Sequence, residues 1–143
     1  MATIKRIADA RWNGDLQSGS GSVALGSGAF KGPYSFKSRF EDGSGTNPEE
    51  LIAGAHAACY SMALSFALAQ AGHKPTSVNT QATVNFGAVP GGFAISRIDL
   101  QTEGKVPGLD AATFQKFAAD AKANCPISKA LAAVEITLQA KLT

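Results

Sequence analysis

The chain has 143 residues, of which 45% are hydrophobic and 17% charged, and these values indicate one globular domain rather than a disordered segment. The net charge is +2, and no basic run or aromatic-basic cluster is present, which argues against nucleic acid as a partner. The segment Met1–Arg6 has no apolar stretch behind its charges, so we expect no signal peptide and a cytoplasmic protein. Without export a structural disulfide is not expected, and the two cysteines are then functional, metal-binding or inert.

The beginning of the chain is predicted to be strands and turns. Ile4–Trp12 has the pattern of a strand, followed by a turn at Asn13-Gly14-Asp15 and by short extended pieces between glycines. Tyr34–Glu41 alternates between two faces, with the aromatic residues on one face and Arg39 on the other. This alternation predicts a third strand there.

A long helix is predicted to begin near Pro48. In one register Asn47 is the N-cap, Pro48 the first helical residue and Glu50 the third. In the other register Thr46 is the cap and Glu49 completes the capping box. Both registers remain open from the sequence.

The body of this helix, Leu51–Ala71, carries no Asp, Glu, Lys or Arg. Its length permits a membrane span, but its many alanines and its polar residues make it only weakly hydrophobic. Gly72 and Pro75 supply the stop. We therefore expect no membrane span, and a helix that is buried on most sides, in the core or at a subunit interface.

The next two extended segments predict a hairpin. Ser77–Phe86 and Phe93–Thr102 flank the turn Pro90-Gly91-Gly92. The apolar parity of the second segment changes between Ile95 and Ile98, which indicates a bulge or a twist.

The end of the chain predicts two helices and a strand. Asp110 is the expected cap of a second helix, Pro126–Ala133 is a short helix, and Val134–Leu142 is a last alternating strand. The order βββ-α-ββ-α-α-β makes residues 1–143 a single α+β domain, with helices packed against antiparallel-rich sheets and a long buried central helix.

Cys59, within the apolar helix, has two interpretations. A free cysteine often serves as a small buried hydrophobe. A reactive thiol must instead ionise, which an apolar site disfavours unless a cation lies nearby. Arg39 could supply that cation, since guanidinium is always charged, or it could be a solvated residue on its strand.

Glu49 and His56 lie on the same side of the predicted helix as Cys59, at steps of three and four residues. Glu49 could hold Arg39 through a two-pronged ion pair and aim the guanidinium at the sulfur, or it could simply favour the first helical turn. His56 could tune the thiol, although a buried histidine more often serves a structural hydrogen bond.

Cys125 directly precedes Pro126, which places it at the N-cap of the short helix, where helix amides lower the pKa of a thiol. Taken alone, this position would make Cys125 the attacking thiol, and the sequence spacing leaves open which cysteine attacks. Cys59, Cys125, His56 and His73 could together supply four zinc ligands, but no pair has a short zinc-binding spacing, so no metal is expected.

Several segments carry a resemblance to a known family. They are Tyr34-Ser35-Phe36 with Arg39-Phe40-Glu41, then Thr46-Asn47-Pro48-Glu49-Glu50-Leu51, His56-Ala57-Ala58-Cys59, and Asn124-Cys125-Pro126-Ile127-Ser128. Together they resemble the osmotically inducible protein C (OsmC) and organic hydroperoxide resistance (Ohr) family, over nearly the whole chain. An arginine shortly before Asn-Pro-Glu is similar to the OsmC branch.

The resemblance implies a thiol-dependent peroxidase without metal, haem or flavin. It makes Cys59 the attacking thiol and Cys125 the resolving one, with Arg39 and Glu49 as the family's arginine and glutamate. It also implies an OsmC/Ohr-like fold in an intertwined homodimer with two sites at the subunit interface.

The function expected from this resemblance is the reduction of organic hydroperoxides, and less efficiently of hydrogen peroxide, to alcohols. The route runs through a sulfenic acid on Cys59 and a Cys59–Cys125 disulfide, which a dithiol such as a lipoyl group or lipoylated protein reduces. Two alternatives use the chain differently: a redox-sensing or zinc-binding protein, and a module that binds hydrophobic ligands with incidental thiols.

Overall fold

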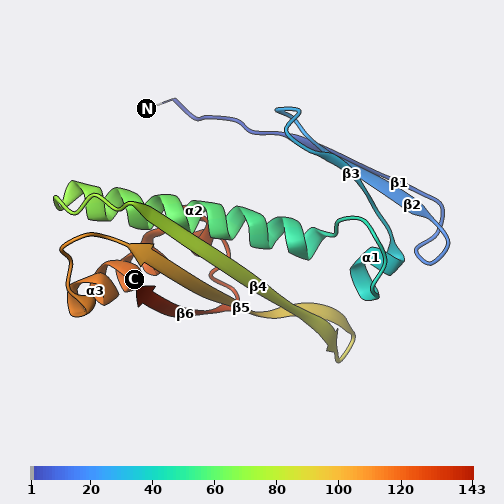
Figure 1. Cartoon of the computed structure of the whole chain (residues 1–143). Helices are drawn as coiled ribbons and strands as arrows, with labels where there is room; N and C mark the ends of the chain where they lie inside the picture. The colour runs from blue at the N-terminus through green and yellow to red at the C-terminus, as the bar shows by residue number, and fades with distance from the viewer. Residues whose placement is uncertain (1) are drawn as a thin grey trace. The chain divides into compact units, whose positions relative to one another are not determined.

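The computed structural model describes residues 2–143, which form two three-stranded sheets and four helices (Figure 1). This is an α+β arrangement, as predicted. The chain divides into two compact units, Met1–Leu51 and Ile52–Thr143, which we call the first and the second unit.

The sheet of the first unit is an antiparallel meander of β1 (Ala8–Asn13), β2 (Ser20–Leu25) and β3 (Lys31–Tyr34). At its centre the rings of Trp12 and Tyr34 lie with centroids 5.3 Å apart. A Cβ at Gly21 would stand 2.5 Å from the Tyr34 ring and 2.7 Å from the Trp12 ring. Glycine at this position therefore lets the two rings cross the strand.

The predicted strand Tyr34–Glu41 is wrong beyond Tyr34, because the chain forms a short helix, α1 (Phe36–Phe40). Its start is a capping box in which the hydroxyls of Ser35 and Ser38 each accept a hydrogen bond from the other residue's amide. Phe36 and Phe40 then pack with ring centroids 4.8 Å apart. Residues four apart share a face in a helix as well as in a strand, so their spacing fits both structures.

The central helix α2 (Pro48–Gln70) begins in the register capped by Asn47. The Asn47 Oδ1 atom accepts a hydrogen bond of 2.7 Å from the amide of Glu50. The hydroxyl of Thr46 donates to Glu50 Oε2 at 2.8 Å instead of capping the helix. The register leaves the carboxylate of Glu49 free of any capping role.

Within one chain α2 buries one face rather than most sides. The buried face repeats every four residues, at His56, Tyr60, Leu64 and Leu68, all with no exposed surface. On another face Met62 and Phe66 are 74% and 66% exposed. The helix is long and apolar enough to cross a membrane by length and composition, but the core helix of a soluble protein can meet the same criterion.

The second sheet joins β4 (Ser77–Val89), β5 (Gly92–Lys105) and β6 (Glu135–Leu142) in that order. The β4–β5 hairpin is antiparallel, and its register shifts where Asn85 pairs with Arg97 and Phe86 with Ile95, which confirms the predicted bulge.

Strand β6 runs parallel to β5, so the chain must cross over between them. The crossover contains α3 (Ala111–Asn124) and α4 (Pro126–Ala130), the second of which is shorter than predicted. Asp110 caps α3 as expected, since its carboxylate accepts from the amide of Thr113 at 2.9 Å.

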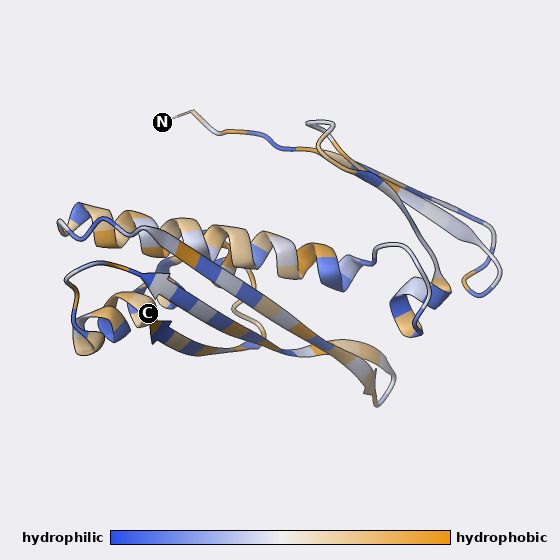
Figure 2. Ribbon diagram, viewed as in Figure 1, coloured by the Kyte–Doolittle hydropathy of each residue, from blue (hydrophilic) through white to orange (hydrophobic). Residues whose placement is uncertain are grey.

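One face of this sheet carries the core. In Figure 2 the strands β4 to β6 alternate between hydrophilic and hydrophobic residues, the pattern of a sheet with one buried face. Side chains from α2, β5, the β5–α3 connection and α3 pack in a single cluster that includes Cys125. Its fully or nearly fully buried members are Tyr60, Leu64, Leu68, Ile98, Leu100, Val106, Phe114, Ala121 and Cys125.

The observed element order, βββ-α-α-ββ-α-α-β, differs from the predicted order by the one helix α1. The rest of the predicted element order, including a long central helix, is confirmed, and the intertwined homodimer stays a prediction. The assignment of residues 1–143 to a single domain stays a prediction.

Candidate active site

The fold of the second unit brings Cys59 and Cys125 together. Cys59 lies in the middle of α2 and is partly exposed, whereas Cys125 joins α3 to α4 and has no exposed surface. The amide of Cys125 ends α3 by donating to the Ala121 carbonyl at 2.9 Å, and its carbonyl accepts from Lys129 at 3.0 Å to begin α4. Both thiols are free, and they lie close enough for each to shift the pKa of the other.

The two thiols have different ionisation. Burial raises the pKa of Cys59, and its hydrogen bond to Cys125 adds to this effect. Burial opposes ionisation of Cys125 too, but the pKa of Cys125 is lowered by the Cys59 thiol and by the hydroxyl and amide of Ser128. The amide of Ile127 faces both sulfurs. This arrangement favours ionisation of Cys125 over ionisation of Cys59.

The N-terminus of α4 was expected to lower the pKa of Cys125, and it does so without the geometry of a regular N-cap. The Cys125 sulfur makes no regular capping hydrogen bond to α4, yet the first amides of that helix lower its pKa. Ser128 adds a hydroxyl that the sequence analysis did not single out. The signal was available, since Ser128 follows Cys125 by one helical turn.

His56 does not contact Cys59 through any hydrogen bond recorded among the described residues. Its Nε2 atom lies 2.7 Å from the hydroxyl of Ser128, and burial lowers the pKa of the ring. His56 therefore belongs to the surroundings of Cys125.

Arg39 and Glu49 form a forked ion pair inside the first unit. The Arg39 Nε atom donates to both Glu49 carboxylate oxygens at 3.2 Å, and Nη2 donates to Oε1 at 2.8 Å. The Glu49 side chain is only 10% exposed and that of Arg39 is 34% exposed. The guanidinium also lies over the Phe40 ring, 5.4 Å from its centroid. Contacts on two sides thus fix the orientation of Arg39, which lies on α1 and not on a strand.

A pocket of about 780 Å³ opens beside Cys59. Aliphatic and aromatic side chains from α2 form one wall, and the α3–α4 corner forms the other. This lining suits an apolar ligand with its reacting end at the thiol. The lining residues are Ala55, Cys59, Met62, Ala63, Phe66, Ala67, Asp120, Ala121, Asn124, Pro126 and Ile127.

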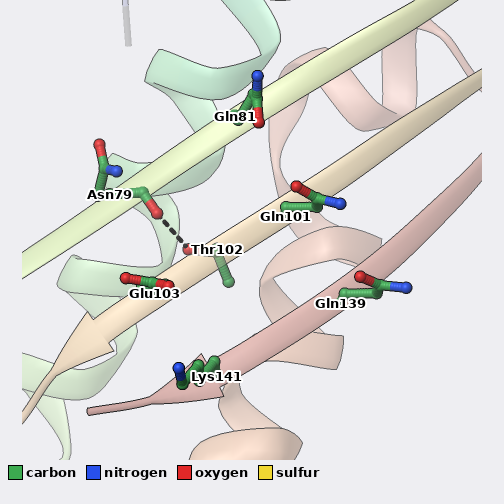
Figure 3. A pocket seen from close by; sticks show the side chains of 7 residues that line it. All are labelled: Asn79, Gln81, Gln101, Thr102, Glu103, Gln139 and Lys141. Carbon is green, nitrogen blue, oxygen red and sulfur yellow. Dashed lines mark hydrogen bonds between the residues drawn. The ribbon is translucent and has the colours of Figure 1, made fainter.

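A second hollow, of about 290 Å³, has a different character (Figure 3). It lies on the solvent side of the β4–β5–β6 sheet and is lined by amides, hydroxyls and charged groups. Thr102 donates to the carbonyl of Asn79 there at 3.2 Å. No thiol lines this hollow, so it offers no redox chemistry. Its lining residues are Asn79, Gln81, Gln101, Thr102, Glu103, Gln139 and Lys141.

Metal ligands do not gather at the thiols. Within residues 2–143 no group of three or more His, Cys, Asp or Glu residues is arranged to hold a metal ion. The chemistry available to the described site is therefore that of two thiols, a hydroxyl, an imidazole and an apolar pocket.

Comparisons with known proteins agree with this site. The profile of the family described as OsmC-like protein matches residues 41–139. The chain is 51% identical over 141 residues to the Peroxiredoxin OsmC of Escherichia coli, covering 98% of both chains. It is 39% identical over 98 residues to an organic hydroperoxide resistance protein of Xanthomonas axonopodis, covering 67% of each.

The fold also matches solved structures. A crystal structure of an organic hydroperoxide resistance protein from Elizabethkingia anophelis superposes with a TM-score of 0.77 and covers 100% of both chains, at 24% identity. At this identity the match supports the fold alone.

Proposed function

Because this chain belongs to the OsmC-like protein family, we propose that it is a thiol-dependent peroxidase that reduces organic hydroperoxides to alcohols. The observation that carries the proposal is the position of Cys59, whose thiol lies in the wall of an apolar pocket and contacts the buried thiol of Cys125. The names of its relatives, a peroxiredoxin and an organic hydroperoxide resistance protein, agree with this chemistry.

In the first step the Cys59 thiolate attacks the distal oxygen of the hydroperoxide. The O–O bond breaks, the alkoxide takes up a proton to become the alcohol, and Cys59 becomes a sulfenic acid. Arg39 supplies the cation that draws the charge of the thiol pair onto Cys59 and stabilises the developing alkoxide. Glu49 holds the guanidinium through its forked contact.

Access decides which cysteine attacks. The amides and hydroxyl near Cys125 favour its thiolate, but its side chain has no exposed surface, whereas Cys59 lines the pocket. A peroxide that enters the pocket therefore reaches Cys59, and Cys125 is left as the resolving thiol.

In the second step the Cys125 thiolate attacks the sulfenic sulfur of Cys59. The S–S bond forms, the S–O bond breaks, and hydroxide leaves as water after taking up a proton. A dithiol, of the lipoyl type, then reduces the disulfide. These steps use no metal, haem or flavin.

The working protein is proposed to be a cytoplasmic homodimer. Two exposed apolar surfaces support the dimer: Met62 and Phe66 on α2, and Ile7, Leu25 and Phe30 on the first unit. Large apolar side chains exposed in this number favour an interaction surface, and a second copy would remove them from water.

The test is peroxide consumption with dihydrolipoamide as reductant, comparing cumene hydroperoxide with hydrogen peroxide. We expect turnover with both and a higher kcat/KM for cumene hydroperoxide, because its phenyl group fits the apolar pocket. Absence of turnover with either peroxide would overturn the proposed function.

A further inference from the structure

A line of buried polar side chains ends at the sulfur of Cys125. His56 has no exposed surface, and its Nε2 atom lies 2.7 Å from the hydroxyl of Ser128, which is 5% exposed. Ser128 lies one helical turn after Cys125 in α4, and its hydroxyl and amide lower the pKa of the Cys125 thiol, as does the neighbouring Cys59. His56 has no role in the peroxidase steps proposed above, and Ser128 has none in the reduction of the disulfide.

The surroundings of the Nδ1 atom of His56 indicate which ring nitrogen carries the proton, and therefore whether His56 donates or accepts in its hydrogen bond with Ser128. The Nδ1 atom of His56 is buried, and none of residues 2–143 offers it a hydrogen-bond partner. A buried N–H without an acceptor is rarer than a buried lone pair without a donor, so we assign the ring proton to Nε2. A second proton on Nδ1 would also lack an acceptor, which agrees with the lowered pKa that burial gives this ring.

With the proton on Nε2, His56 donates to the oxygen of Ser128. The hydroxyl hydrogen of Ser128 is then free to point at Cys125. Tyr60 also lies near this sulfur. Burial raises the pKa of Tyr60 most, and a charge on Cys125 raises it further. Its hydroxyl is already committed, because it donates to the Ala118 carbonyl at 2.9 Å. Ser128 is thus the side-chain hydroxyl directed at the sulfur.

We propose that His56 and Ser128 are positioning residues that stabilise Cys125 as the thiolate leaving group when the Cys59–Cys125 disulfide is reduced. The inference rests on the proposed function, since it assumes that this disulfide is the oxidised form of the site. Cys125 is buried and Cys59 faces the pocket, so the incoming thiolate of the dithiol attacks the sulfur of Cys59.

The electron balance of this step is simple. A bond forms between the reductant sulfur and Cys59, the Cys59–Cys125 bond breaks, and its electron pair leaves on Cys125. The hydrogen bond from Ser128 stabilises that charge, and a thiol of lower pKa leaves faster. The second thiol of the reductant then attacks its own sulfur in the mixed disulfide and releases Cys59.

The first measurement is the titration of Cys125 by ultraviolet thiolate absorbance in a Cys59→Ser background. Ser128→Ala should raise the midpoint by about one to two pH units, which corresponds to the free energy of one hydrogen bond to a charged group. Ser128→Thr keeps the hydroxyl and should stay near the parent. His56→Leu should raise the midpoint by less than Ser128→Ala, and His56→Gln, which keeps an N–H donor, should restore most of it.

The second measurement is the rate at which dihydrolipoamide reduces the disulfide in proteins whose Cys59 is intact. The disulfide is formed with the thiol oxidant diamide, so that no peroxide is needed. Ser128→Ala should lower the rate roughly 3- to 10-fold at neutral pH, given the dependence of exchange on the pKa of the leaving thiol.

The matched control is Ser61→Ala, which removes a hydroxyl of α2 that donates to Thr80 of β4 at 2.8 Å instead of interacting with either thiol. It should move neither the midpoint nor the rate. Equal midpoints for Ser128→Ala, His56→Leu and this control would overturn the positioning role. Both measurements work without peroxide, so a protein that fails the peroxidase assay but shows the shifts loses only the proposed function.

Discussion

The two units of this chain differ in how they are held together. Among residues 2–51 Val23 is the one apolar side chain that is buried, while Ile4, Ile7 and Leu16 are more than half exposed. The second unit instead packs the sheet β4–β5–β6 and the helices α2 and α3 around one continuous core. A three-stranded sheet without a second layer has little apolar burial to offset the entropy of ordering it.

The difference separates two kinds of site residue. The thiols lie in the well-packed unit, where the fold of one chain fixes them against each other. The Arg39–Glu49 pair lies in the thinly packed unit, where its geometry is local but its surroundings depend on what covers that unit. We therefore expect substitutions in the two units to fail in different ways.

The largest effect is expected at the thiols. Cys59→Ser should abolish peroxide consumption, because no other thiol reaches the pocket. Cys125→Ser should consume about one equivalent and then stall or over-oxidise Cys59 to the sulfinic acid. Mass spectrometry after one equivalent of peroxide should show an intramolecular Cys59–Cys125 bond in the parent. The reverse pattern in the two variants would make Cys125 the attacking thiol.

The next effect is on stability and separates the two units directly. Phe114→Ala should lower the free energy of unfolding by about 3–5 kcal/mol, since its fully buried ring fills the second unit's core. Phe30→Ala, in the first unit, removes a ring that is 39% exposed and should cost much less in a dilute monomer. Urea unfolding measures both.

Phe114→Ala and Phe30→Ala can also be compared at several protein concentrations, which tests the proposed dimer. A loss for Phe30→Ala that depends on protein concentration would mean that a second copy covers the first unit. A loss that equals that of Phe114→Ala at every concentration would contradict the difference between the units.

The ion pair should give an effect on catalysis with little change in fold. Arg39→Ala should lower the rate toward cumene hydroperoxide on the order of 100-fold, or about 3 kcal/mol of transition-state stabilisation. Arg39→Lys should recover only part of it, because an ammonium cannot match the fork of Glu49 and also reach a sulfur. Glu49→Gln should lose less. An unchanged rate and an unchanged Cys59 titration in Arg39→Ala would remove Arg39 from the site.

The smallest effect concerns acid stability. The hydroxyl of Thr137 and then Arg97 and Asn85 lower the pKa of Asp99 to about 2, so the folded protein favours the ionised form. Stability from this group is therefore complete above the usual aspartate pKa and is lost as the pH falls from about 4 toward 2. Asp99→Asn should flatten the fall in melting temperature in that range.

The first unit provides the counterpart to this acid test. The pKa of Asp15 is lowered by the amide and then the hydroxyl of Ser18, through contacts within a single turn. Asp15→Asn should flatten the acid profile less than Asp99→Asn, because Asp99 joins three neighbouring strands. Equal changes in the melting-temperature profile of the two variants would mean that a carboxylate held within one turn stabilises the fold as much as one that joins three strands.

Local patterns in the sequence predicted much of this fold, because the responsible interactions are local. The cap at Asp110 and the bulge opposite Asn85 follow from short segments, and Asn47 was one of the two helix caps that the sequence left open. The helix α1 was missed because the spacing of Phe36 and Phe40 fits both a strand and a helix. The capping box of two serines is what favours the helix. Its two serines are a weak signal beside the alternating aromatic residues.

The site divides in the same way. The fork between Arg39 and Glu49 was one of the two interpretations of Glu49 that the sequence left open, and the structure contains it. The contact between Cys59 and Cys125 joins distant segments, so no spacing rule predicts it, and the resemblance alone suggested their pairing. The bond between His56 and Ser128 was missed because the two residues are 72 positions apart in the sequence.

The parallel pairing of β5 with β6 has a consequence for biosynthesis. Cys125 lies in the crossover between these strands, and β6 is the last element of the chain. A parallel pair can close only after its whole connection has been made. On the ribosome Cys59 is therefore exposed well before Cys125 can be fixed beside it. We expect a nascent chain that ends before Cys125 to hold a solitary Cys59 thiol, without the second thiol that resolves its sulfenic acid.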